Sequence, residues 1–197
     1  CTSWDCTAAT PGDECADAIE VMDGANAFDT SLMTPSTPAP EDMCPGTYFD
    51  WGESNDGWYM YTATMDGSTN FSTCDAASYD TSLALYEGSC DNQVACNGDS
   101  PNAGSCQPYF SEIDYATTAG TVYYLRIGAW NGDGQGPGTL TITPPAVPVS
   151  GACCIDDWTC MDDLMSDECV GWGGTFMGEG TVCDSVDCAA GAGGDEC

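Results

Sequence analysis

Carboxylates are the main side chains in this sequence that could perform acid–base or ligand chemistry. The 197 residues include 32 acidic side chains, no histidine and a single basic residue, Arg126. Triads that need histidine and mechanisms that need lysine are therefore excluded within the chain. Paired carboxylates could serve a glycosidase, but among this many acids such pairs arise by default. We expect a protein without catalytic activity.

The formal net charge of −31 comes from the missing lysines and arginines. A compact body with this charge repels itself unless cations bind or screen it. Nucleic acid and anionic membranes are excluded as partners, and no apolar run is long enough for membrane insertion. Two interpretations stay open: a solvated acidic surface without a specific ion, or specific calcium sites.

The two ends of the sequence repeat one motif. CTSWDCTAATPGDEC at residues 1–15 and CDSVDCAAGAGGDEC at residues 183–197 match at nine of fifteen positions, with an offset of 182 residues. A period of this length indicates domain-sized copies in tandem. We expect residues 1–14 to end a preceding copy and residues 189–197 to begin the next one. Cys197 would then have its partner in that next copy.

Short segments separated by Gly and Asp turns predict an all-β chain. The predicted strands cover residues 58–64, 69–74, 82–86, 109–117, 121–128 and 138–143. Asp66-Gly67 predicts a two-residue hairpin turn between the first two. About eight strands of this kind fit a jelly-roll-like β-sandwich over residues 15–143. Residues 144–150 (PPAVPVS) predict a proline-rich linker, and residues 151–188 a small module that depends on disulfides.

The 15 cysteines predict a disulfide scaffold and an oxidising compartment. A zinc site is the weaker interpretation, because histidine and finger-type cysteine spacing are absent. Cys90 and Cys96 bracket a five-residue loop, and we expect them to pair. Cys15–Cys44 and Cys74–Cys106 would then close the sandwich. The vicinal pair in the tail is expected to have two different partners, because a bridge between adjacent residues is strained. The pairing is otherwise open among Cys153, Cys154, Cys160, Cys169, Cys183 and Cys188.

Several strings follow one another between residues 12 and 143: GDECADAIEV, FDTS, GWYMYTAT, FSTC, YDTSLALYEGSC, ACNGD, TAGTVYYLRIGAW and GTLTIT. In this order they resemble the cysteine-rich form of the bacterial pre-peptidase C-terminal β-sandwich, found in large secreted proteins. The segment that begins GACCIDDWTC resembles a short module that accompanies such sandwiches. The resemblance implies an accessory, non-catalytic role in adhesion, substrate binding or structural display.

The resemblance also implies where calcium would bind. In such sandwiches a Y-D-T corner and a C-N-D-like loop lie at neighbouring strand ends. The matching positions, with two acids in the loop before Trp58, are the expected calcium ligands: Asp80, Asn97, Asp99, Glu53 and Asp56. Gly98 stands where the family often has aspartate, which would remove one ligand. Turn capping is the alternative role for Asp80.

Aromatic side chains offer a second kind of binding site. Most occupy alternating strand positions, where core packing is the expected role: Trp58, Tyr59, Tyr61, Tyr123 and Tyr124. Trp51 and Trp130 fall in loops and are candidate contacts to a glycan or to a neighbouring copy. Arg126 lies in a predicted strand between apolar neighbours, so we expect it to pair with a carboxylate.

Two functions from different classes fit these features. The first is a non-catalytic structural repeat of a secreted fibre or long cell-surface protein, which contacts copies of itself head to tail and binds calcium. The second is an accessory module that binds carbohydrate or matrix for a secreted hydrolase or adhesin, with exposed Trp51 and Trp130 as its signature. Regular fibres of the native material would favour the first.

Overall fold

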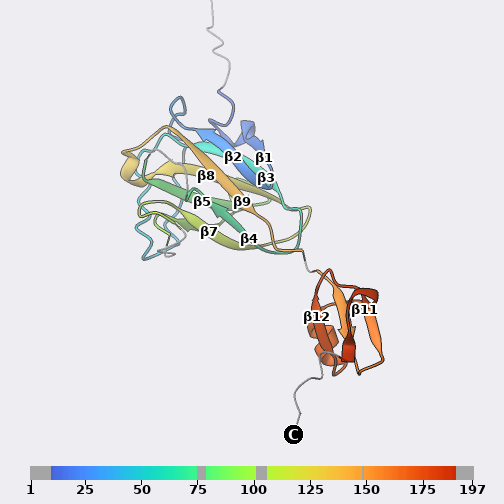
Figure 1. The fold of residues 1–197 in the computed structure, drawn as a ribbon. Helices are drawn as coiled ribbons and strands as arrows, with labels where there is room; N and C mark the ends of the chain where they lie inside the picture. The colour runs from blue at the N-terminus through green and yellow to red at the C-terminus, as the bar shows by residue number, and fades with distance from the viewer. Residues whose placement is uncertain (1–9, 75–78, 101–105, 148, 190–197) are drawn as a thin grey trace, which may run out of the picture. The chain divides into compact units, whose positions relative to one another are not determined.

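The computed structural model describes residues 10–74, 79–100, 106–147 and 149–189. The chain forms two compact units, Cys1–Pro145 and Ala146–Cys197 (Figure 1). The predictions for Cys1, Cys6 and Cys197 lie outside the described residues. No helix in the described ranges has the length and apolar character that a membrane span requires.

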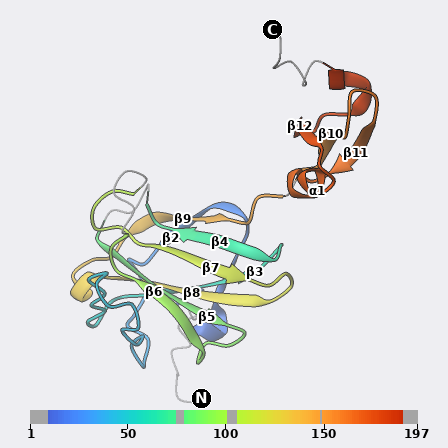
Figure 2. The same cartoon turned by 90° about the horizontal axis from the view of Figure 1, so that it is seen from below.

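The described part of the first unit is a sandwich of two β-sheets (Figure 2). The five-stranded sheet has the order β1-β3-β8-β5-β6, and the four-stranded sheet has the order β2-β9-β4-β7. Short 3-10 helices precede β1 and follow β8. The elements are η1 (Cys15–Asp17), β1 (Ile19–Val21), β2 (Gly24–Asp29), β3 (Gly57–Thr62), β4 (Gly67–Ser72), β5 (Thr81–Glu87), β6 (Gln93–Asn97), β7 (Glu112–Thr117), β8 (Val122–Ala129), η2 (Trp130–Gly132) and β9 (Pro137–Thr143).

Eight of these strands pair in a nested order along the chain. β5 pairs with β6, β4 with β7, β3 with β8 and β2 with β9, and all four pairs are antiparallel. One long hairpin folded over on itself produces this nesting, which is the topology of a jelly roll. The predicted all-β, jelly-roll-like sandwich is therefore confirmed.

The turn at Asp66-Gly67 does not close a hairpin. Gly67 has a φ of +128°, which glycine adopts readily. The strands on either side of it, β3 and β4, belong to different sheets. The turn therefore passes from one sheet to the other, and the predicted hairpin is wrong. Turn residues such as Asp-Gly predict where the chain changes direction, but they do not predict whether the two flanking strands pair with each other.

Apolar side chains of β5 contribute to two separate clusters. Leu83 and Leu85 belong to the core between the sheets. Ala84 and Tyr86 belong to a second cluster, which includes side chains from the long connection between β2 and β3. β5 is thus buried on both faces, which explains its unbroken apolar pattern. The strand aromatics expected in the core are buried at Trp58, Tyr59, Tyr61 and Tyr123.

The second unit is a three-stranded antiparallel sheet with one short helix. Its strand order is β11-β10-β12. The elements are β10 (Gly151–Cys154), β11 (Cys160–Leu164), α1 (Ser166–Gly171), β12 (Thr175–Glu179) and η3 (Cys183–Ser185). Its buried apolar residues are Ala152, Cys153, Cys154 and Cys169. Disulfide sulfur therefore takes the place of an apolar core here.

Three disulfides close the sandwich: Cys15–Cys90, Cys44–Cys96 and Cys74–Cys106. The last of these agrees with expectation, whereas the predicted Cys90–Cys96 and Cys15–Cys44 bridges are wrong. Cys96 lies within β6, opposite Ala84, and joins the cluster covered by the β2–β3 connection, which contains Cys44. Cys90 lies in the β5–β6 turn and reaches η1 instead. The short loop between Cys90 and Cys96 therefore does not decide their pairing, because each cysteine bonds to a segment far away in the sequence.

The tail cysteines pair as Cys153–Cys169, Cys154–Cys188 and Cys160–Cys183. The vicinal cysteines therefore have different partners, as expected. The first bridge joins β10 to α1 and the third joins β11 to η3. Each element of the small unit is thereby tied to another by a covalent bond or by strand pairing.

Candidate ligand-binding site

Arg126 is buried in β8, with 1% of its surface exposed. Its guanidinium donates Nε to Oδ1 of Asp56 over 3.0 Å and Nη2 to Oδ2 over 2.9 Å. Two further hydrogen bonds reach the carbonyl oxygens of Pro38, at 2.7 Å, and Ser36, at 2.5 Å. The expected pairing of Arg126 with a carboxylate is confirmed. The ion pair attaches the β2–β3 connection to the five-stranded sheet.

This arrangement changes the roles expected for Asp56 and Trp51. Both carboxylate oxygens of Asp56 accept hydrogen bonds from Arg126 and from Ser36, and the residue is fully buried. Asp56 is therefore a partner of arginine and not a calcium ligand. Trp51 is only 5% exposed, and it lies 5.1 Å from the Arg126 guanidinium, with Trp58 at 5.0 Å. Trp51 is thus a packing residue, because its loop folds onto the sheet.

The open end of the β5–β6 hairpin brings two other acids together. Asp80 directly precedes β5, and Asp99 follows β6 by two residues. Leu83 pairs with Asn97, so these acids lie at the same end of the antiparallel pair. Both line one cavity of about 370 Å³, whose walls are Tyr48, Asp80, Asp99, Tyr109 and Trp130.

Backbone hydrogen bonds join the loops that form this cavity. The amide of Asp99 donates to the carbonyl of Thr47 over 2.6 Å, and the amide of Trp130 donates to that of Asp80 over 3.1 Å. At Gly98 a Cβ would lie 2.5 Å from the carbonyl oxygen of Thr47. Glycine is therefore required here for close contact between two backbones. An aspartate would not fit at this position.

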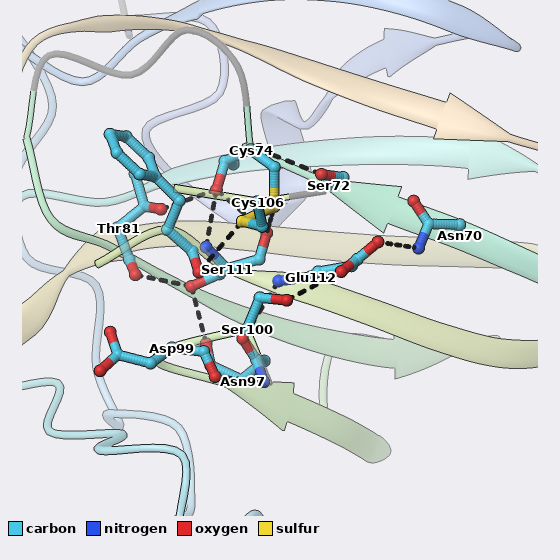
Figure 3. Close-up of a disulfide and its surroundings, with 12 residues drawn as sticks. Asn70, Ser72, Cys74, Thr81, Asn97, Asp99, Ser100, Cys106, Ser111 and Glu112 are labelled. Atoms are coloured by element: carbon cyan, nitrogen blue, oxygen red, sulfur yellow. Dashed lines mark hydrogen bonds between the residues drawn. A yellow bond between two sulfur atoms is a disulfide. The ribbon is translucent and has the colours of Figure 1, made fainter. Parts of the chain in front are cut away.

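A buried polar cluster lies beside the Cys74–Cys106 disulfide (Figure 3). The hydroxyl of Ser111 lies 2.6 Å, 3.0 Å and 2.8 Å from the carbonyl oxygens of Thr81, Asn97 and Gly98. Thr73 accepts from the amide of Ser111 and shares a 2.7 Å hydrogen bond with the Thr81 hydroxyl. The end of β4 is thereby connected to the ends of β5, β6 and β7. Thr73, Thr81 and Asn97 belong to the strings noted in the sequence, whereas Ser111 does not.

Besides Asp56, two more of the expected calcium ligands do not line the cavity. Asn97 is buried, its Oδ1 accepts from the amide of Glu112 over 3.0 Å, and its Nδ2 donates to the carbonyl of Asp99 over 3.2 Å. Glu53 is exposed in the β2–β3 connection, where its backbone packs beside Gly132 of η2. Figure 3 shows the Asp99 side chain directed away from the Cys74–Cys106 disulfide. Of the five expected ligands, the structure brings Asp80 and Asp99 to the cavity.

The two cavity carboxylates are partly desolvated. Burial, with a smaller contribution from the charge of Asp99, raises the pKa of Asp80 to about 6. Burial also raises the pKa of Asp99. Oδ1 of Asp80 is buried without a hydrogen-bond partner in the described part of the chain. A cation in the cavity would favour the ionised form of both groups.

Sequence reasoning missed two of the cavity residues. Tyr109 was expected to begin a strand, but β7 begins at Glu112, so Tyr109 lies in a loop and is exposed. Tyr48 lies in the β2–β3 connection, close to Gly46, and is also exposed. Trp130 was a candidate and does line the cavity. Both tyrosines lie near Gly or Pro in the sequence, and this pattern could have identified them as loop residues and candidate binding residues.

Asp80→Asn is expected to raise the free energy of unfolding at pH 7 by up to about 1 kcal/mol, after allowance for solvent screening. The raised pKa means that ionisation of Asp80 destabilises the folded state as the pH rises from 3.8 to about 6. The stabilisation should therefore disappear near pH 3.5. Urea unfolding at both pH values measures the effect. Asp91→Asn, in the β5–β6 turn, removes the same charge, and equal gains in both variants would contradict a local cause.

No protein-family model matches the chain, and no curated protein matches it. Among solved structures it is similar to the pre-peptidase C-terminal domain of a collagenase from Bacillus anthracis, with 12% identity and a TM-score of 0.40, over 64% of this chain and 94% of that one. It is also similar to a β-glucosidase from Kluyveromyces marxianus in complex with glucose, with 17% identity and a TM-score of 0.31, over 47% of this chain and 10% of that one.

Proposed function

We propose that the chain is a non-catalytic structural repeat of a secreted fibre or long cell-surface protein, joined to neighbouring copies head to tail. The observation that carries the proposal is the repeated motif, with nine of fifteen positions identical at an offset of 182 residues. Between the two occurrences lie a jelly roll and a small disulfide unit. This is the organisation expected of an array of domain-sized beads.

The chemistry of the chain supports an extracellular, non-catalytic role. Six disulfides within the described residues require an oxidising environment. The absence of histidine and lysine removes the usual general bases and nucleophile activators. The one arginine is buried, so trypsin-like proteases find almost no accessible site in the folded unit. Resistance to proteolysis and to unfolding suits a structural repeat outside the cell.

Electron microscopy of a chain with three consecutive copies tests this proposal. We expect a filament with a regular axial repeat and two densities per copy, because each copy has two compact units. Longer native material should show the same spacing. Beads that are independently oriented and monodisperse, with no regular spacing, would contradict the fibre role.

An accessory binding module is the second candidate, and the exposed aromatic side chains of the cavity favour it. Aromatic faces stack on sugar rings, and carboxylates accept hydrogen bonds from sugar hydroxyls.

Calcium binding at Asp80 and Asp99 also remains a prediction. Its ligand set is now two carboxylates, whereas calcium takes six to eight oxygens. A thermal stability that excess chelator leaves unchanged would contradict a specific calcium site.

A further inference from the structure

The exposed aromatic residues of the sandwich gather in one place. In the part of the first unit that the structure describes, these residues are Tyr48, Tyr109 and Trp130, with exposed fractions of 74%, 64% and 41%. All three line the cavity that contains Asp80 and Asp99. By contrast Trp51, Trp58 and Tyr59 are buried. The three exposed rings are therefore not needed for the core, and their position beside two acids calls for an explanation by ligand binding.

The backbone at these rings is held in an unfavourable conformation. Tyr48 has a φ of +54° and Tyr109 a φ of +75°. Bulky residues rarely adopt the left-handed region, and such conformations concentrate at ligand sites. The fold thus maintains strained loops in order to present aromatic side chains at the cavity.

We infer that this cavity binds an organic ammonium group, with the three aromatic rings around the cation and the carboxylates of Asp80 and Asp99 beside it. Aromatic faces attract alkylated cations through cation–π interactions, which strengthen as water is excluded. The carboxylates supply the counter-charge.

Two other ligand classes fit the cavity less well. Calcium needs six to eight oxygen ligands, and an indole ring provides none. The carbonyl oxygens of Thr81, Asn97 and Gly98 converge on the Ser111 hydroxyl instead. A neutral sugar would stack on the rings but would leave two partly desolvated carboxylates without a counter-charge. The combination of rings and acids therefore favours a cation with an apolar surface.

The ammonium group must come from outside these 197 residues. The sequence contains no lysine, and its one arginine is buried in the ion pair with Asp56. No side chain of a second copy can therefore fill the cavity with a cation. The source is either a lysine side chain from outside these residues or a free quaternary ammonium compound. This inference does not depend on the tandem array, because an isolated chain also contains the cavity.

A ligand panel on the unaltered, oxidised chain tests the inference. Isothermal titration calorimetry and NMR are used with tetramethylammonium, N-acetyl-lysine amide, tert-butanol, glucose and calcium chloride. We expect both ammonium compounds to bind and to shift the indole signal of Trp130. tert-Butanol has nearly the shape of tetramethylammonium without its charge and should bind at least about tenfold more weakly. Tighter binding of one ammonium compound identifies the source.

Matched variants show whether binding occurs at this cavity. Trp130→Ala and the double variant Asp80→Asn/Asp99→Asn should each weaken tetramethylammonium binding about tenfold. Trp172→Ala removes an exposed tryptophan from the second unit, and Asp91→Asn removes a charge at the other end of the hairpin, so neither should change affinity. Equal binding of tert-butanol, preferential binding of glucose or calcium, or no ammonium binding would each overturn the inference. The ligand panel on the unaltered chain tests ammonium binding even if a variant fails to fold.

Discussion

Arg126→Met is expected to lower the free energy of unfolding by about 3–5 kcal/mol. The substitution leaves the fully buried Asp56 carboxylate without its counter-charge. The carbonyl groups of Ser36 and Pro38 also lose their donor. Because the pair holds the β2–β3 connection against the five-stranded sheet, the outer cluster with Trp51 should loosen as well. Urea unfolding followed by circular dichroism measures the loss.

Removing both charges separates the effect of burial from that of packing. Arg126→Met combined with Asp56→Leu leaves no buried unpaired charge, so we expect it to recover part of the loss. Asp91→Asn is exposed and should change stability by no more than about 0.5 kcal/mol. A loss for Arg126→Met as small as that of Asp91→Asn would show that the carboxylate is solvated in solution. A double variant less stable than Arg126→Met would show that packing around the guanidinium dominates.

Reduction of the disulfides is expected to unfold the second unit completely. Its three bridges close loops with sequence separations of 16, 34 and 23 residues. In the chain-entropy model each contributes about 3–4 kcal/mol. The sum of about 10 kcal/mol exceeds what a core of this size supplies, since its buried apolar residues are mostly the bridged cysteines themselves.

Stepwise reduction with a phosphine, followed by two-dimensional NMR, measures this loss. Amide signals of residues 151–188 should collapse to random-coil positions, while the sandwich keeps dispersed signals longer because it has its own apolar core. The double variant Cys160→Ser/Cys183→Ser removes one bridge and should destabilise the unit by about 3 kcal/mol. Dispersed signals from the fully reduced tail would contradict this account.

Local patterns identified most strands, because strand formation depends on alternation and turn residues that lie close together in the chain. The predicted segment 121–128 corresponds to β8 (Val122–Ala129), and 82–86 to β5 (Thr81–Glu87). Three strands of the sandwich, β1, β2 and β6, were not among the predicted ones. β1 is stabilised as a strand by its partner, β3. Local patterns extend over a few neighbouring residues, whereas the partner of a strand lies far away in the sequence.

The candidate site was predicted in part. The resemblance suggested Asp80 and Asp99, and the structure places both at one cavity because they flank strands that form one hairpin. Asp56 and Trp51 were misplaced, because nothing local shows that a long loop folds back and is buried against Arg126. Whether a loop residue is exposed or buried depends on contacts with residues far away in the sequence.

The sequence by itself determined the all-β class, the oxidised cysteines and the absence of histidine- and lysine-based catalysis. These follow from composition and from periodicity along the chain. Only the tertiary structure decided the disulfide partners in the sandwich, the ion pair of Arg126 with Asp56, and the gathering of Tyr48, Tyr109 and Trp130 around Asp80 and Asp99. The physical reason is that a jelly roll joins residues far apart in the chain, so a site at its strand ends exists only once the nested pairs have formed.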